Sequence, residues 1–163
     1  MLRRGYLQKP YNMKTLYVMC GIPGSGKTTL SKQIADEYIA VRLSLDEMGY
    51  VRQFKLIPHI IEALENGESV VADSLYTKKQ WRTEILEAVK GIECKRVLVC
   101  MNTPLDICIL RNRGREKPLP DFVVEYQFEK YEKPTLDEGW DEIIYVDTDW
   151  NKNTLKTVFN KRR

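Results

Sequence analysis

Short apolar runs alternate with amphipathic stretches along most of the chain. The apolar runs predict buried strands at residues 16–20, 39–45, 69–72, 96–101 and 143–146. Between them, apolar side chains recur at the three- to four-residue spacing of helices. Strands that alternate with helices favour a parallel sheet whose crossover helices cover both faces. The pattern therefore predicts an α/β fold: a doubly wound, five-stranded parallel sheet flanked by helices.

The boundaries of this domain follow from the same pattern. Residues 1–12 precede the first periodic segment and predict a loosely ordered N-terminal extension, so a single domain is expected over residues 13–163. Thr77 and Gln80 have the spacing of a capping box and predict the start of a helix. Apolar residues at helical spacing, including Trp81, Tyr126 and Tyr131, are interpreted as core. A last helix is expected at residues 151–161.

Composition narrows the class of protein without identifying it. The chain has 163 residues, 43% of them hydrophobic and 30% charged, with a net charge of +3. These values suit a soluble domain, and the mild positive charge is compatible with an anionic ligand. The four cysteines form no C-x-x-C pair, which indicates reduced thiols and a cytoplasmic location. No apolar run has the length of a membrane span.

A phosphate-binding loop is the strongest motif in the sequence. Residues 21–28 read GIPGSGKT and match G-x-x-x-x-G-K-[ST] in full, between a predicted strand and a predicted helix. The glycines allow backbone N–H groups to surround phosphate oxygens, and the helix start adds positive potential. Lys27 would contact the β- and γ-phosphates, and Thr28 would be a ligand of Mg²⁺. The residues expected to bind ATP here are Gly21, Pro23, Gly24, Ser25, Gly26, Lys27, Thr28 and Thr29.

Two classes of P-loop protein fit the rest of the sequence poorly. Asp46 begins a D-x-x-G match to GTPases, but it lies only 19 residues after Lys27, and no N-K-x-D motif is present. A motor-type ATPase usually has a water-activating carboxylate after Asp73, and Ser74 stands there instead. Phosphoryl transfer to an acceptor remains, for which Asp46 would orient or deprotonate the nucleophile.

A basic segment between two predicted helices suggests a lid over the phosphates. Arg111, Arg113, Arg115 and Lys117 put four cations in seven residues, with Gly114 among them. A solvated helix end is the simpler alternative. In a P-loop protein, however, such a cluster favours a clamp that closes on the nucleotide.

Several motifs together resemble those of the polynucleotide 5′-hydroxyl kinases of bacteriophages and bacteria and their zeta-toxin-like relatives. They are GIPGSGKTTL, LSLD, ADSLYTKKQWR, and RNRGR followed by a helix and EGWDEI, and they extend over residues 14–146. The resemblance implies an ATP- and Mg²⁺-dependent phosphotransferase of the P-loop kinase fold.

The resemblance also implies roles for individual residues. Asp46 matches the general base and Asp73 an acidic residue that supports the active site. Arg111 and Arg115 match the R-N-x-x-R lid, whose second arginine reaches the ATP phosphates. Arg82 matches an arginine at the start of the next helix.

Two departures from the family pattern concern the acceptor. Gly49 stands where phage enzymes have an arginine for the acceptor's 3′-phosphate, and the nearest arginine is Arg52; Leu75 and Tyr76 replace Thr-Asn. If the acceptor is a nucleic acid, Arg52 and Arg82 are expected to hold it, beside Asp46 and Asp73. The acceptor is predicted to be the 5′-hydroxyl of a polynucleotide. A small hydroxyl-bearing metabolite or nucleotide is the alternative, and a nucleotide-dependent binding module is a third. The sequence leaves the oligomeric state open.

Overall fold

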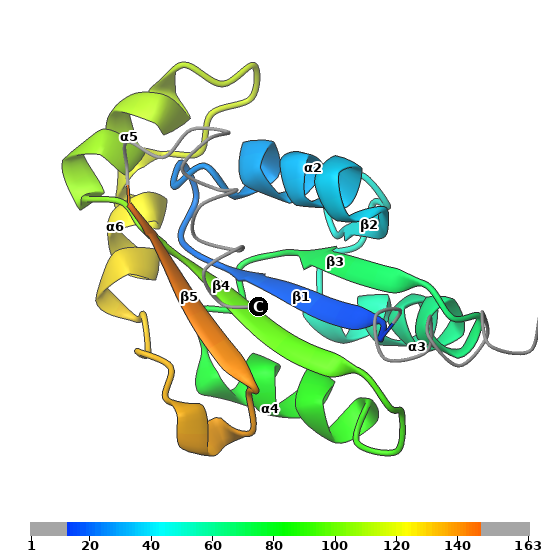
Figure 1. Cartoon of the computed structure of the whole chain (residues 1–163). Coiled ribbons are helices and arrows are strands. Elements are labelled where there is room, and N and C mark those ends of the chain that lie inside the picture. Colours follow the sequence, from blue (N-terminus) through cyan, green and yellow to red (C-terminus); the bar gives the residue numbers. More distant parts are fainter. Residues whose placement is uncertain (1–12, 148–163) are drawn as a thin grey trace, which may run out of the picture.

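The computed structural model describes residues 13–147, which form a central parallel sheet with helices on both faces (Figure 1). The strand order in this part of the chain is β2-β3-β1-β4-β5, and every neighbouring pair is parallel. The bounds of the strands are Thr15–Cys20 (β1), Ala40–Ser44 (β2), Ser69–Asp73 (β3), Lys95–Asn102 (β4) and Glu142–Asp147 (β5). The predicted five-stranded α/β sheet is therefore confirmed.

The helices connect the strands and frame one edge of the sheet. Their bounds are Lys27–Tyr38 (α2), Ile57–Glu65 (α3), Lys79–Ala88 (α4), Leu105–Arg113 (α5) and Asp121–Glu129 (α6), with short 3₁₀ turns at Gln53–Leu56 (η1) and Leu136–Glu138 (η2). α2 covers one face of the sheet, and α3 and α4 lie on the other (Figure 1). α5 and α6 pack together beyond the carboxyl ends of the strands, where the P-loop also lies (Figure 1).

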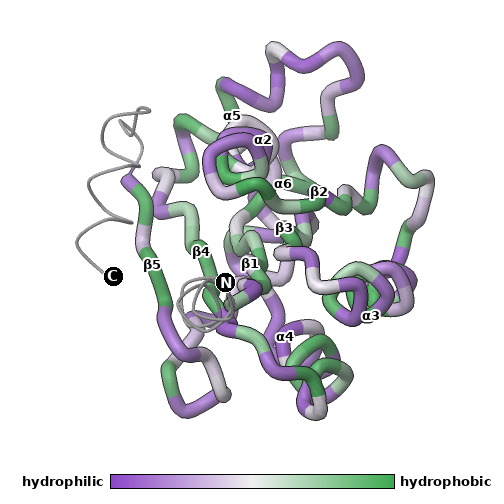
Figure 2. The backbone as a smooth tube through the Cα atoms, turned by 45° about the vertical axis from the view of Figure 1, so that its right-hand side comes forward, coloured by the Kyte–Doolittle hydropathy of each residue, from purple (hydrophilic) through white to green (hydrophobic). Residues whose placement is uncertain are grey.

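Successive side chains of a strand point to opposite faces of the sheet, and this alternation builds two hydrophobic layers. Met19 of β1 packs with Leu30 and Ile34 of α2 in one cluster. Cys20 packs with Ile85 of α4 in the other. The colouring by hydropathy shows the central strands as mostly apolar, with polar segments gathered in the connections (Figure 2). Burial on both faces explains the near-continuous apolar runs that predicted these strands.

Some local expectations need correction. The helix α4 begins at Lys79 with Lys78 as N-cap, and no side chain caps it, so the capping box predicted for Thr77 and Gln80 is wrong. Tyr126 is 50% exposed and is not core. The predicted extension at residues 1–12 and the predicted helix at 151–161 lie outside the described residues.

The described residues hold no helix with the length and apolar character needed to cross a bilayer. Cys20, Cys94, Cys100 and Cys108 are all buried free thiols, as the sequence predicts.

Candidate functional site

The loop from Gly21 to Gly26 joins β1 to α2 in a conformation that only glycine adopts easily at two positions. Gly24 has φ of +82° and Gly26 of +99°. A Cβ atom on Gly24 would lie 2.2 Å from the carbonyl oxygen of Cys108 in α5, so a side chain there would displace that helix. No side chain caps the start of α2, and its first turn carries no acidic residue. The amide N–H groups at this helix start are therefore available to an anion.

Lys27 and Thr28 lie at the start of α2, as the motif requires. Lys27 Nζ donates a hydrogen bond to the carbonyl of Ile22 at 3.1 Å, across the loop. Burial lowers the pKa of Lys27 below its ordinary value; the Asp73 carboxylate opposes this shift, and the Arg115 charge adds to it. Thr28 is exposed, so its hydroxyl is accessible to a ligand. A lysine that is charged but poorly solvated binds phosphate strongly, because little hydration is lost on contact.

Asp73 ends β3 and belongs to a hydrogen-bonded unit that joins three elements. Its Oδ2 lies 2.7 Å from Nη2 of Arg42 in β2 and accepts a hydrogen bond from Ser31 Oγ of α2 at 2.8 Å. Arg42 Nε donates to Ser31 Oγ at 2.7 Å, and Arg42 Nη1 pairs with Glu47 at 2.8 Å. The arginine therefore neutralises both carboxylates and fixes the one that lies behind the P-loop.

The turn that carries Asp46 is hydrogen-bonded to the end of β3, where Asp73 lies. The Leu45 amide donates to the Asp73 carbonyl at 3.1 Å, and Ser44 is in register with Asp73 across the sheet. Gly49 closes the turn with φ of +73°, and its amide donates to the Asp46 carbonyl at 3.1 Å. Asp46 is exposed, and none of residues 13–147 forms an ion pair with it. Its carboxylate is therefore accessible from solvent.

The basic segment connects α5 to α6 and lies beside the P-loop. Arg111 Nη1 donates to the Ser25 carbonyl at 3.4 Å, and the Arg115 charge is close enough to lower the Lys27 pKa. Arg113 instead pairs with Asp121 at the start of α6. The structure thus places Arg111 and Arg115 beside the P-loop, whereas Arg113 forms an exposed ion pair between the two helices.

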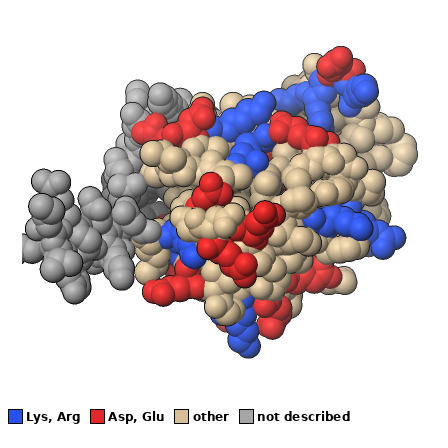
Figure 3. Space-filling view, turned by 90° about the vertical axis from the view of Figure 1, so that its right-hand side faces the viewer, with Lys and Arg blue, Asp and Glu red and all other residues tan. Residues whose placement is uncertain are grey.

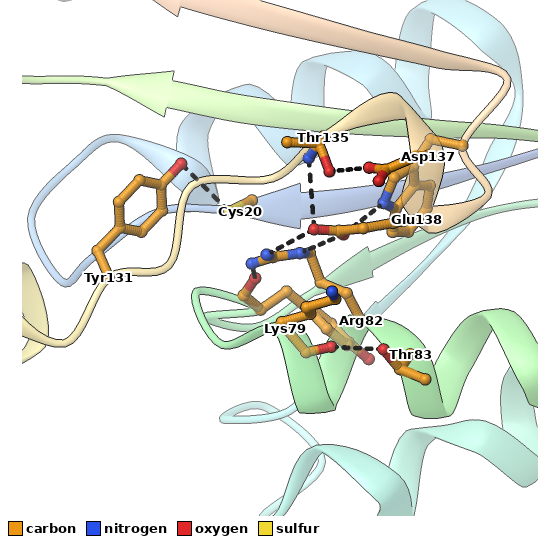
Figure 4. A network of polar contacts seen from close by, with 10 residues as sticks. Cys20, Lys79, Arg82, Thr83, Tyr131, Thr135, Asp137 and Glu138 are labelled. Atoms are coloured by element: carbon orange, nitrogen blue, oxygen red, sulfur yellow. Dashed lines mark hydrogen bonds and ion pairs between the residues drawn. The ribbon is translucent and has the colours of Figure 1, made fainter.

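Arg82 is not placed to hold an acceptor. Its side chain is fully buried: Nε and Nη2 donate to the two carboxylate oxygens of Glu138 at 2.8 and 3.0 Å, and Nη1 donates to the Tyr76 carbonyl at 3.0 Å (Figure 4). All of this hydrogen bonding is internal, so we correct the expectation that Arg82 binds substrate. Arg52 is exposed at the start of η1, and its proposed contact with an acceptor stays a prediction.

Three residues of the site were missed in the sequence. Arg42 was hidden within a predicted strand. Asn112 is fully buried and spans the lid loop: its Nδ2 donates to the Leu119 carbonyl at 2.7 Å, and its Oδ1 accepts from the Leu119 amide at 3.2 Å. Tyr131 was interpreted as core but lines a pocket beside the P-loop. The signal for Asn112 was its position between Arg111 and the loop glycine; Arg42 and Tyr131 gave no signal beyond their side-chain type.

Comparison with known proteins assigns the chain to a family. The family model described as chromatin associated protein KTI12 matches residues 49–161, which is more than half of the chain. The chain belongs to the KTI12 family. A model of the AAA domain matches residues 16–55, the segment that contains the P-loop.

Two curated relatives agree with this assignment. The chain is 24% identical over 158 residues to protein kti12 of Schizosaccharomyces pombe, covering 80% of this chain and 56% of that protein. It is 25% identical over 150 residues to L-seryl-tRNA(Sec) kinase of Methanococcus maripaludis, covering 82% of this chain and 59% of the relative. The chain thus spans less than two thirds of either relative.

Solved structures show the same fold. Kti12 of Chaetomium thermophilum in complex with ADP-AlF3 superposes with a TM-score of 0.78 at 21% identity, over 90% of this chain and 96% of that one. A fungal RNA kinase gives 0.70 at 18% identity, over 90% and 80%. A sugar kinase of Janibacter sp. HTCC2649 gives 0.72 at 18% identity, over 90% and 95%. This KTI12-family chain therefore has the nucleotide-binding P-loop fold of kinases.

Proposed function

We propose that this KTI12-family chain is an ATP-dependent kinase whose acceptor is a hydroxyl group of RNA, with the 5′-hydroxyl end as the first candidate. The observation that carries the proposal is the position of Asp46. Its exposed carboxylate follows the strand that pairs with Asp73, at the sheet edge where Lys27 and the lid arginines meet. An exposed carboxylate at this position is able to accept the proton of an acceptor hydroxyl.

The residues assign a simple reaction sequence. The backbone of the P-loop, Lys27 and Arg115 hold the triphosphate of ATP. The acceptor hydroxyl oxygen attacks the γ-phosphorus, and the bond from that phosphorus to the β,γ-bridging oxygen breaks, so that ADP leaves. Asp46 takes the hydroxyl proton, and the cations stabilise the charge on the transferred group.

The residues present also fit a magnesium ion. Mg²⁺ usually takes few protein ligands and completes its shell with water and phosphate oxygens. Thr28 at the start of α2 offers a hydroxyl, and Asp73 offers its Oδ1 for a water-mediated contact, because Ser31 and Arg42 both donate to its Oδ2. When bound, the ion would neutralise phosphate charge.

The choice of RNA rests on the relatives and not on bulk charge. One relative is named a seryl-tRNA(Sec) kinase, and one structural neighbour is an RNA kinase. The net charge is only +3, and acidic and basic side chains are interspersed on the face seen in Figure 3. Recognition would therefore depend on particular side chains near the site, with a modest salt dependence.

A second candidate is a nucleotide-dependent binding module, and the Arg42–Asp73 pair favours it. Arg42 neutralises the carboxylate that other P-loop proteins direct at the metal or at water, and such pairing suits a protein that holds nucleotide without turning it over quickly. Both candidates predict nucleotide binding; only the first predicts a phosphorylated acceptor.

The test uses γ-labelled ATP and a panel of acceptors: 5′-hydroxyl RNA, 5′-hydroxyl DNA, aminoacylated tRNA and hydroxyl-bearing metabolites. We expect label on RNA with the parent protein and none with Lys27→Ala. Label on metabolites alone would overturn the RNA assignment. ATP binding with no labelled acceptor would leave the binding module as the function.

A further inference from the structure

A pocket of about 380 Å³ lies beside the P-loop, and the phosphate site does not account for it. Gly21 and Ile22 form the side next to the loop, and the end of β4 forms another. Three aromatic rings from separate parts of the fold complete the lining: Phe128 of α6, Tyr145 of β5, and Tyr131 between them. The volume lies in the range of small-ligand sites and suits a single nucleoside.

The aromatic rings are available to a ligand. Phe128 is 48% exposed and Tyr145 is 45% exposed, so both expose apolar surface to solvent beside the pocket. Tyr131 is half-buried, and its hydroxyl accepts a long hydrogen bond from Cys20 Sγ at 3.9 Å (Figure 4). This contact ties the ring to the last residue of β1, immediately before the P-loop.

Polar groups among these rings favour a nucleotide over a purely apolar ligand. Lys133 is exposed and adds a cation to the lining, whereas the amide of Asn102 is already engaged, because its Nδ2 donates to Asp147 Oδ1 at 3.3 Å. Aromatic faces for stacking together with a cation for phosphate are the combination by which proteins bind single-stranded nucleic acid.

The pocket lies on the α4 side of the sheet, opposite α2. Ile144 and Val146 pack in the cluster that contains Leu30 of α2, so Tyr145 between them projects to the other face. Cys20, which contacts Tyr131, packs in the cluster with α4. The phosphates of ATP belong at the start of α2, and in-line transfer puts the acceptor and the leaving ADP on opposite sides of the γ-phosphorus. The α4 side therefore suits the acceptor better than the adenine of ATP.

We infer that this pocket binds one nucleobase of a single-stranded RNA acceptor on the β4–β5 side of the P-loop, while Asp46 lies on the β2–β3 side, so that the acceptor strand crosses the loop between them. The base stacks on Tyr145 and Phe128, and Lys133 contacts a flanking phosphate. This inference rests on the proposed RNA kinase function and specifies how that acceptor is held.

The decisive experiment combines protein variants with a modified RNA. Tyr145→Ala and Phe128→Ala remove half-exposed rings, so both variants should fold. Each should raise KM for a 5′-hydroxyl oligoribonucleotide by about fivefold or more, the scale of one lost base–aromatic stack. The Kd for ATP should stay within twofold of the parent value, about the limit of measurement. Phe122→Ala is the matched control, because Phe122 is a 70% exposed ring on α6 outside the pocket lining.

A second arm identifies the base directly. Each base near the reacting end is replaced in turn with an abasic site. At one position this change should raise KM as much as Tyr145→Ala, and the two changes together should not add. A 2-aminopurine at that position should be quenched on binding by the parent and less by Tyr145→Ala. Additive effects, or unchanged KM in both ring variants while RNA is still phosphorylated, would overturn the pocket assignment alone. A rise in the Kd for ATP would assign the pocket to adenine. No RNA phosphorylation by the parent would overturn the proposed function and this inference with it.

Discussion

Arg42 Nη2 lies 2.7 Å from Asp73 Oδ2, and the same guanidinium lies 2.8 Å from a carboxylate oxygen of Glu47. The side chains of Arg42 and Asp73 are only 11% and 6% exposed, so the pair is largely removed from water. Arg42 comes from β2, Asp73 from β3, and Glu47 from the turn that carries Asp46. One arginine thus links the strand end behind the P-loop to the turn expected to orient the acceptor.

Removing this arginine should destabilise the protein strongly. Arg42→Met leaves the Asp73 carboxylate buried, with the hydrogen bond from Ser31 in place of an ion pair, and breaking a buried ion pair in this way costs about 3–5 kcal/mol in free energy of unfolding. The measurement is urea unfolding of parent and variant.

Two comparisons test whether burial is the cause. Arg42→Met with Asp73→Asn should recover much of the lost stability, because the buried side chain that has lost its arginine is then neutral. Arg113→Met breaks an exposed pair with Asp121 and should cost at most about 1 kcal/mol. Equal losses for Arg42→Met and Arg113→Met would contradict a special role for Arg42.

Asp46→Asn separates catalysis from nucleotide binding. If Asp46 accepts the proton of the acceptor hydroxyl, the amide should lower kcat by about 10²-fold or more, the scale of a positioned general base. The Kd for ATP should change by less than about threefold, since the side chain is exposed and lies outside the P-loop. Single-turnover transfer and calorimetry measure the two quantities. Loss of ATP binding along with turnover would make Asp46 a ligand of the nucleotide or its metal.

Much of this arrangement could be read from residue patterns. The apolar runs located the five strands because a parallel sheet is buried on both faces. The P-loop was identified because its glycines and lysine must surround the phosphates of a nucleotide, which allows few other residues at these positions. Gly24 shows this restriction most plainly, because a Cβ atom there would lie too close to the carbonyl oxygen of Cys108.

The errors concern residues whose partners are distant in the chain. Arg82 matched a family arginine, but its partner Glu138 lies 56 positions away, and no local sequence pattern predicts this ion pair. Tyr126 fitted a helical apolar spacing but faces solvent, whereas Tyr131, which follows the end of α6 at Glu129, packs against the core cluster as predicted. Periodicity predicts which positions share a face but not whether another element covers that face.

Arg82 should therefore behave as a structural residue. Arg82→Met leaves Glu138 without its cation in a site where that side chain is 4% exposed, and we expect a loss of about 3–5 kcal/mol in the free energy of unfolding. At a temperature where the variant is still folded, KM for the acceptor should stay close to the parent value. A raised KM for RNA in a variant of normal stability would restore the sequence-based prediction that Arg82 binds the acceptor.

Asn112 should control closure of the lid. Its side chain makes paired hydrogen bonds with the backbone of Leu119 across the loop that carries Arg115. Asn112→Ala would leave the Leu119 backbone groups without their partner and free the loop, so KM for ATP should rise several-fold while acceptor KM changes less. Arg115→Ala is the comparison: it should weaken ATP binding without loosening the loop. Increased protease cleavage after Arg113, which both variants retain, in Asn112→Ala alone would support this role of Asn112; equal cleavage in both variants would contradict it.

Lys27 should take up a proton when ATP binds at alkaline pH. Burial lowers the pKa of Lys27 below the ordinary value of a lysine, so a neutral fraction is present at alkaline pH before ATP binds. Bound phosphates favour the charged form and raise the pKa, which means that binding consumes protons and that ATP affinity falls as the pH rises through the free-protein value. Calorimetry in two buffers of different ionisation enthalpy, at several pH values between neutral and 10.5, measures this uptake. Lys27→Arg keeps its charge throughout this range and should show no such uptake. Equal uptake by parent and Lys27→Arg would mean that another group titrates, and that Lys27 is already charged before ATP arrives.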